Sequence, residues 1–155
     1  MTTVMEAFRT RCEFLQRMTL DYANGVPDEH WAFSPNARFA PFCKQLRHVV
    51  CVRGVYNGAL VSKSADFSKK HSHYSDGLTR AELTTALAEK HEALLAILDT
   101  VDTNPPIDFF GRQFSFVDFT YTMVQHEALH HGQWSVYASL AGLETPLSWR
   151  LEWAL

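Results

Sequence analysis

Apolar side chains recur every three or four positions in four long stretches of the sequence, and segments containing helix-breaking residues separate them. The stretches cover residues 3–24, 40–62, 79–101 and 116–141. Thr79, with Glu82 three residues later, forms a capping-box pattern that predicts the start of the third stretch. Gly142 directly follows the fourth, as is typical of a helix C-terminus. The pattern predicts an all-α fold, a four-helix bundle in which each helix turns an apolar stripe inward.

The segments outside the predicted helices lack strict alternation of apolar and polar residues, so no β-strand is expected. Residues 63–77 are predicted to form a polar loop, and residues 107–116 a short extended turn around Gly111. Residues 147–153 are predicted to add one or two helical turns. A chain of 155 residues with 46% apolar residues suits one domain with a single core, which we expect to span residues 1–155.

Charge and composition argue against several classes of function. The net charge is −3 and the Lys and Arg residues are scattered, so no nucleic-acid partner is expected. No apolar run approaches the roughly 18 residues of a membrane span, and the charged, amphipathic N-terminal residues do not resemble a secretory signal. The three cysteines stand at unrelated spacings, which is typical of a reducing compartment. We therefore expect a cytoplasmic protein that does not bind a membrane.

Two of the eight histidines occupy positions in the fourth predicted helix where a bundle normally carries Leu or Met. The predicted core-facing seam of this helix comprises Phe116, Phe119, Met123, His126, His130, Gln133, Tyr137 and Leu140. His126 and His130 are four residues apart, which places their Cβ atoms about 6 Å apart on one face. At that separation both imidazoles can bind one ion at the Zn–N distance of about 2.0–2.1 Å. The spacing predicts two metal ligands, with hydrogen-bonded core histidines as the alternative.

His48 lies in the middle of the second predicted helix and is the candidate for a third ligand. Helix axes in a bundle pack about 8–10 Å apart, which is within the reach of opposed histidines. Three imidazoles from two helices would leave coordination positions open, as in catalytic metal sites. His131 points about 100° away from His130, so we expect it at the rim of the site or in an interface. His91 is expected to be solvated.

Residues 126–130 also match the H-E-x-x-H pattern of zinc proteases, in which Glu127 would act as the general base. The longer form of the motif fails, because Gln133 and Val136 stand where a glycine and a third histidine belong. Two downstream carboxylates remain as candidates for a protease ligand, Glu144 and Glu152. Zinc proteases normally bind peptide along a sheet edge, and no strand is expected here. We therefore interpret Glu127 as an interhelical or solvent-facing carboxylate.

The run from His126 to Gln133, HEALHHGQ, resembles the H-x-x-x-H-R-G-Q signature in helix four of the DinB/YfiT-like metalloenzyme superfamily. Residues 141–146 resemble the Gly- and Pro-containing stretch that follows this signature. Residues 31–35 and 39–49 resemble the loop before the family's second helix and the start of that helix, which carries the first metal-binding histidine. The resemblance spans nearly the whole chain, and it departs at His131, where the family usually has Arg.

This resemblance implies a four-helix bundle, often dimeric, that binds nickel, zinc, iron or manganese through His48, His126 and His130. Characterised members include thiol-dependent S-transferases and a mycothiol-dependent maleylpyruvate isomerase. The resemblance thus implies a metal-dependent enzyme that acts on a small molecule, with a low-molecular-weight thiol as co-substrate, and a homodimer. Two alternatives stay open: a non-catalytic metal-binding or stress-related bundle, and a small zinc protease.

Three further residues are candidates for roles around the predicted site. Gln133 and Tyr137 follow His130 on the same helical face, so either side chain could contact a ligand or substrate. Gln133 would orient such a molecule or would simply hydrogen-bond to a neighbouring helix. Tyr137 would form a pocket wall, with a role as acid or proton donor as the alternative. Cys51 is three residues after His48 and is a possible soft ligand, but we favour a buried and unreactive thiol.

Overall fold

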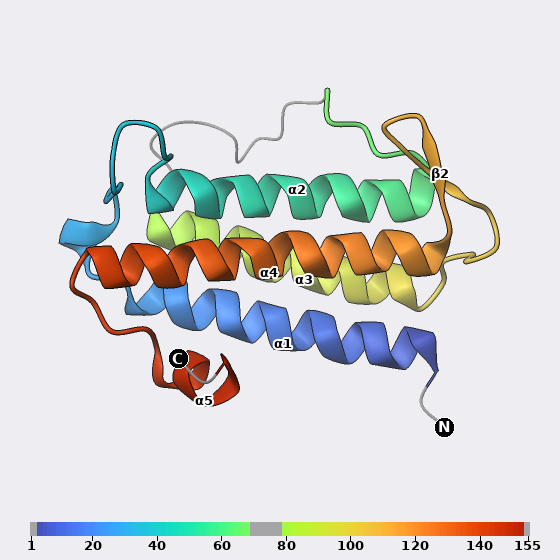
Figure 1. Cartoon of the computed structure of the whole chain (residues 1–155). Helices are drawn as coiled ribbons and strands as arrows, with labels where there is room; N and C mark the ends of the chain where they lie inside the picture. The colour runs from blue at the N-terminus through green and yellow to red at the C-terminus, as the bar shows by residue number, and fades with distance from the viewer. Residues whose placement is uncertain (1–2, 69–78, 154–155) are drawn as a thin grey trace.

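The computed structural model describes residues 3–68 and 79–153, and part of the predicted polar loop lies outside these ranges. Four long helices lie side by side (Figure 1). They are α1 Val4–Gly25, α2 Phe42–Ser62, α3 Arg80–Leu98 and α4 Phe116–Leu140. Helices α1 and α2 each pack against both α3 and α4, so the four form a closed ring around a common core. The predicted all-α four-helix bundle is confirmed.

Local side-chain contacts explain where the helices begin. Thr3 and Thr79 each form a capping box with the glutamate three residues on, Glu6 and Glu82. The hydroxyl of Ser115 accepts a hydrogen bond from the backbone N–H of Asp118 and caps α4 in the same way. These contacts satisfy backbone N–H groups that have no partner within the first helical turn.

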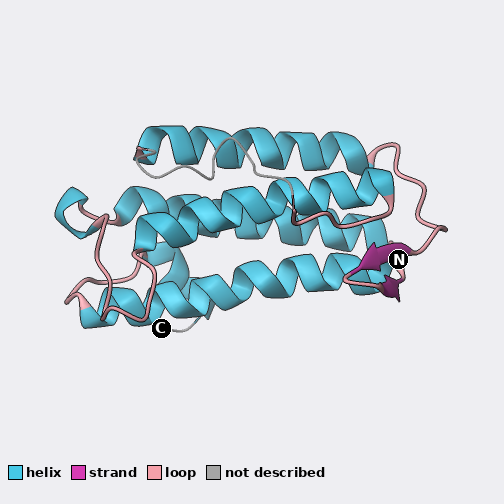
Figure 2. Cartoon of the chain, turned by 90° about the horizontal axis from the view of Figure 1, so that it is seen from above, coloured by secondary structure: helices cyan, strands magenta, loops and turns pink. Residues whose placement is uncertain are grey.

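Two short strands, β1 Ile107–Phe109 and β2 Arg112–Phe114, form an antiparallel hairpin at one end of the bundle (Figure 2). The expectation of no strand is wrong for this segment, because three residues are too few to show an alternating pattern. Phe110 and Gly111 both have positive φ, 53° and 77°, and make the tight turn. The hairpin is joined to the chain after α2 by a bridge between Ser64 and Asp108.

A 3-10 helix, Asp28–His30, lies between α1 and α2, and helix α5 Leu147–Trp153 confirms the predicted final turns. Trp149 of α5 is fully buried, and its indole N–H donates a hydrogen bond to the carbonyl of Met18 at 2.8 Å. The C-terminal helix is therefore anchored on α1. No helix within the two described ranges is both long and apolar enough to cross a membrane.

Buried apolar residues form two clusters along the bundle. One lies toward α5 and includes Met18, Leu46, Leu83, Leu87 and Trp134. The other lies toward the hairpin and includes Phe8, Tyr56, Leu60, Ile107 and Phe119. The predicted seam of α4 is correct at most positions, but Gln133 and Leu140 are exposed and do not belong to the core.

Candidate metal centre

The facing sides of α2 and α4 bring together the three histidines that the sequence singled out. His48 comes from α2, and His126 and His130 lie one turn apart in α4. One ring nitrogen from each lies within 4.8 Å of the others. Among the described residues this is the group of His, Cys, Asp and Glu side chains that is close enough to hold a metal ion. We refer to His48, His126 and His130 as the three-histidine cluster.

The spacing of the ring nitrogens fits a shared metal ion. His48 Nε2 and His126 Nε2 are 3.2 Å apart. Two nitrogens bound tetrahedrally at the usual Zn–N distance would be separated by about 3.3 Å. The ring centroids lie 4.8 to 5.3 Å apart with interplanar angles of 61° to 76°, so the rings meet edge to face rather than in a stack. His130 Nδ1 is buried without a hydrogen-bond partner, which is an uncommon state for a buried polar atom.

Burial holds the cluster in the form that binds metals. It lowers the pKa of His48 and His130. Burial, together with the neighbouring His130 and His48, lowers the pKa of His126 to about 4. All three imidazoles are therefore neutral at pH 7, with lone pairs available for a cation.

Aromatic rings enclose part of the cluster. The ring of Tyr56 meets the ring of His126 edge to face at 5.8 Å, and the ring of Trp134 lies 6.1 Å from that of His130. Burial raises the pKa of Tyr56 to about 12, so its phenol stays protonated. On the side toward the bundle core, a small pocket borders His126, and its lining includes Val49, Val52, Tyr56 and Met123. These walls lower the local polarity and limit access of water to that side.

The two residues predicted to act beside the metal differ in their surroundings. Gln133 is exposed, and its side-chain hydrogen bond to His130 opposes the effect of burial on the pKa of that histidine. The hydroxyl of Tyr137 donates a hydrogen bond to the carbonyl of Ala40 at 3.0 Å, so it holds the connection that leads into α2. The contact places Gln133 at the cluster, whereas Tyr137 supports the chain beside it.

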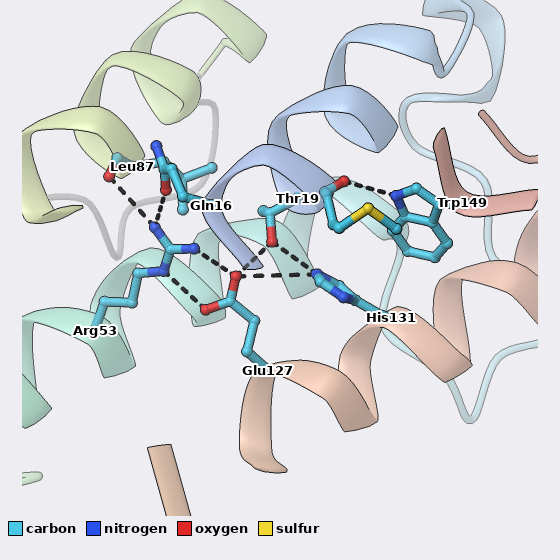
Figure 3. A network of polar contacts seen from close by, with 8 residues as sticks. Gln16, Thr19, Arg53, Leu87, Glu127, His131 and Trp149 are labelled. Atoms are coloured by element: carbon cyan, nitrogen blue, oxygen red, sulfur yellow. Dashed lines mark hydrogen bonds and ion pairs between the residues drawn. The ribbon is translucent and has the colours of Figure 1, made fainter. Parts of the chain in front are cut away.

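Glu127 points from α4 toward Arg53 of α2 and Thr19 of α1 (Figure 3). It is 6% exposed and forms an ion pair with Arg53, while the hydroxyl of Thr19 donates a hydrogen bond to its carboxylate. Burial would raise the pKa of Glu127, but the charge and hydrogen bonds of Arg53 outweigh it and lower the pKa to about 2. The prediction of an interhelical carboxylate is confirmed. A carboxylate held in this way is poorly placed to act as the base of a protease.

The other protease candidates lie at the C-terminal end of the chain, where Glu144 pairs with Arg150 and Glu152 pairs with Arg17. Neither glutamate belongs to the three-histidine cluster. Cys51 is buried, as predicted, and burial raises the pKa of its thiol to about 11. It is not part of the three-histidine cluster either.

The expectation that His131 lies at a rim or interface is wrong. The residue is 2% exposed, and its ring packs 4.8 Å from that of Trp149. Its Nε2 lies 2.8 Å from the hydroxyl oxygen of Thr19, which accepts from it because the hydroxyl proton goes to Glu127. Helices α1 and α5 cover this side of α4, and the spacing of residues within α4 does not predict contacts made by other helices. His91, expected to be solvated, is instead half-buried and lines the small pocket.

The polar residues that sequence reasoning missed are Arg53 and Thr19. Arg53 falls between Val52 and Tyr56 on a helix whose inward positions are otherwise mostly apolar. An arginine near an inward face, together with a glutamate on another helix, is a signal for a buried ion pair. The signal does not say which helices face one another, so only the fold identifies the pair.

In this bundle, three histidines from α2 and α4 meet at one point. The fold and the site together define the class of protein: a helical bundle with a candidate metal site between two of its helices. The family model of the DinB superfamily matches residues 11–134, and the chain belongs to this superfamily. Among solved structures, the DinB-like protein YjoA from Bacillus subtilis has a similar fold, with a TM-score of 0.71 and 17% sequence identity. The match covers 90% of this chain and 94% of YjoA. No curated protein matches the chain.

Proposed function

We propose that this protein binds a divalent metal ion through His48, His126 and His130 and uses it as an enzyme acting on a small molecule. The observation that carries the proposal is the convergence of three neutral imidazoles, with two ring nitrogens 3.2 Å apart. Imidazole ligands suit nickel, zinc and iron, and the resemblance to DinB-like proteins adds manganese to the candidates.

The chain supplies an incomplete coordination shell. Three imidazoles leave positions open for water or substrate, and a bound divalent ion would supply a Lewis acid that lowers the pKa of a water or thiol at those positions. His48, His126 and His130 hold the ion, while Tyr56 and Trp134 keep water from parts of the site. Gln133, exposed beside His130, orients the molecule that enters.

A low-molecular-weight thiol is the co-substrate we propose, on the strength of the family resemblance. A divalent ion held by His48, His126 and His130 would lower the pKa of a nearby thiol and so favour the nucleophilic thiolate at neutral pH. We therefore propose one of two reaction classes, taking place in the cytoplasm. Either the thiolate is transferred to a small electrophile, or the thiolate assists the isomerisation of a small electrophile.

A screen of small thiols and electrophiles with the metal-loaded protein tests this proposal. Turnover is expected in the wild type and is expected to be lost in His48→Ala. His30→Ala, which changes a half-buried histidine of the 3-10 helix outside the cluster, is the matched control and is expected to retain turnover. Metal binding without turnover of any thiol would instead support a non-catalytic metal-binding bundle. Peptidase activity that Glu127→Ala abolishes would support the protease.

We also propose a homodimer formed through the outer face of α4. Helix α4 contains no Lys or Arg, and its exposed residues include Val117, Tyr121, Leu129, Val136 and Leu140, each at least 52% exposed. A solvent-facing helix surface normally carries charged residues, and large exposed apolar patches mark interfaces. In a two-fold interface the same patch faces itself, and residues near the axis approach their own copies. Asp118 is the charged residue among the exposed residues of α4, so the patch brings little like charge together. The occupant we propose is therefore a second copy of this chain.

A further inference from the structure

A buried polar network touches all four helices of the bundle (Figure 3), and its carboxylate, Glu127, directly follows His126 of the three-histidine cluster. Its centre is the ion pair between Arg53 of α2 and Glu127 of α4. Arg53 also donates hydrogen bonds to the side chain of Gln16 in α1 and, at 3.4 Å, to the carbonyl of Leu87 in α3. Thr19 of α1 donates to Glu127. One guanidinium and one carboxylate thus connect every helix of the ring.

The ion pair is directional. Arg53 Nε donates to one carboxylate oxygen of Glu127 at 2.9 Å, and a terminal guanidinium nitrogen donates to the other oxygen. A two-point contact between planar groups fixes both the distance and the relative rotation of the elements that carry them. The guanidinium and carboxylate here therefore set how α4 is rotated and shifted against α2.

The same two helices carry the candidate metal ligands. Arg53 is five residues after His48 in α2, and Glu127 is the immediate neighbour of His126 in α4. Any rotation or slide of α4 that breaks the ion pair therefore moves His126 and His130 relative to His48. A buried ion pair contributes little stability compared with apolar side chains of similar volume, so stability alone does not account for this one.

We propose that Arg53 and Glu127 are positioning residues for the three-histidine cluster, whose ion pair sets the α2–α4 register at which His48 meets His126 and His130. The part of this proposal that concerns metal affinity rests on the proposed function, whereas the part that concerns the histidine geometry does not. Glu127 thereby acts through Arg53 and the helix packing and does not touch a substrate.

The first test measures the histidine geometry in metal-free protein. The double variant R53M/E127L replaces the ion pair with apolar side chains of similar length. NMR cross-relaxation between the rings of His48 and His126, whose centroids are 5.3 Å apart in the structure, reports their approach. We expect these cross-peaks in the wild type and expect them to weaken or vanish in a double variant that still unfolds cooperatively. Unchanged cross-peaks would overturn the proposal.

The second test titrates the same proteins with Co²⁺ and follows visible absorption, which also reports coordination geometry. Loss of a supporting contact around a metal site typically weakens metal binding about 10- to 100-fold, and we expect a loss of this size in R53M/E127L. Equal affinity in the double variant and the wild type would overturn the positioning role. If the wild type itself binds no Co²⁺, the proposed function fails, and the NMR result alone decides whether the pair positions the histidines.

Two further variants control for folding and for charge. R53K keeps the positive charge but loses the two-point contact, so we expect a folded protein with weakened Co²⁺ binding, and full affinity in R53K would contradict the geometric argument. R9M removes the exposed interhelical ion pair between Arg9 of α1 and Asp99 after α3, which connects helices that carry no ligand. R9M is expected to bind Co²⁺ as the wild type does. Should the double variant fail to fold, R53K and R9M together still decide the question.

Discussion

Burial keeps His48, His126, His130 and His131 neutral in the interior of the bundle. It lowers the pKa of His48 and His130, and it is the largest of the effects that lower the pKa of His126 and His131 to about 4. In an unfolded chain the same groups titrate near the ordinary histidine pKa of about 6.5. At pH values between the folded and unfolded pKa values, these histidines bind protons in the unfolded chain but not in the folded chain, so acid favours unfolding.

The metal-free protein is therefore expected to lose stability as the pH falls from about 6.5 toward 4. His131, which is 2% exposed, alone accounts for a loss on the order of 2 kcal/mol at pH 5. Glu127 does not contribute to this loss of stability between about pH 6.5 and 4.5. Because its pKa is lowered to about 2, its ionised carboxylate stabilises the fold fully above about pH 4.5, and this stabilisation is lost only as the pH falls toward about 2. Urea unfolding at pH 7.5 and pH 5 measures the difference.

The variant His131→Asn serves as the control, since it removes one of the titrating groups and is expected to show a shallower pH dependence. Equal unfolding free energies for the wild type at the two pH values would contradict this account of the buried histidines.

At the level of single residues, the sequence predicted what depends on local spacing. The i, i+4 relation of His126 and His130 follows from helix geometry, and the structure confirms that they share a face. His131 and Arg53 were missed or misplaced because their surroundings come from α1, α3 and α5, which are distant in sequence. Spacing within one helix carries no information about which side chains another helix brings.

Two glycines, one just after a helix and one inside a helix, distinguish the effect of backbone strain from that of helix propensity. Gly142 follows α4 with a φ of 71°, and Gly58 lies within α2. A Cβ added at either position would meet no atom within 4 Å, so packing affects neither substitution. Gly142→Ala is expected to destabilise the protein by about 1 kcal/mol, because L-residues disfavour positive φ. Gly58→Ala is expected to stabilise it by about 0.5–1 kcal/mol, because Ala loses less conformational entropy in a helix.

Thermal unfolding of both variants beside the wild type checks the pair, and each serves as the control for the other. Changes of the same sign at the two positions would refute the assignment of a left-handed residue after α4.

At the level of elements, apolar periodicity was sufficient to predict the long helices but not the hairpin. The helices carry five or more turns each, so their stripes repeat often enough to be recognised. Strands β1 and β2 have three residues each and are held by contacts from elsewhere, among them the ring of Phe109 against Tyr56 and Phe119. Such tertiary contacts override local preference in short segments.

For the molecule as a whole, the largely apolar outer face of α4, which carries no Lys or Arg, predicts self-association. Val136→Lys places a charge within this stripe, where Val136 is 55% exposed, and two copies would then bring like charges together. We expect a dimer for the wild type and a monomer for Val136→Lys in sedimentation equilibrium. Val4→Lys, at a comparably exposed position of α1, is the matched control and should remain dimeric. A monomeric wild type would contradict the proposed interface.

The whole fold is shared with YjoA at 17% identity, so the fold alone does not distinguish the chemistry of this chain from that of its relatives. The chemistry has to be read from the three-histidine cluster and the residues that hold it. These residues occupy less than a tenth of the sequence, and their substitution tests function without removing the bundle.

Metal content of the protein purified without added metal and without a polyhistidine tag tests the central claim most directly. Elemental analysis of the wild type is expected to give about one equivalent of nickel, zinc, iron or manganese per chain. The variant His126→Ala, shown by circular dichroism to keep its helices, is expected to have lost most of it. A wild-type protein that neither contains a divalent metal nor takes one up, or a His126→Ala variant that holds as much as the wild type, would contradict the account.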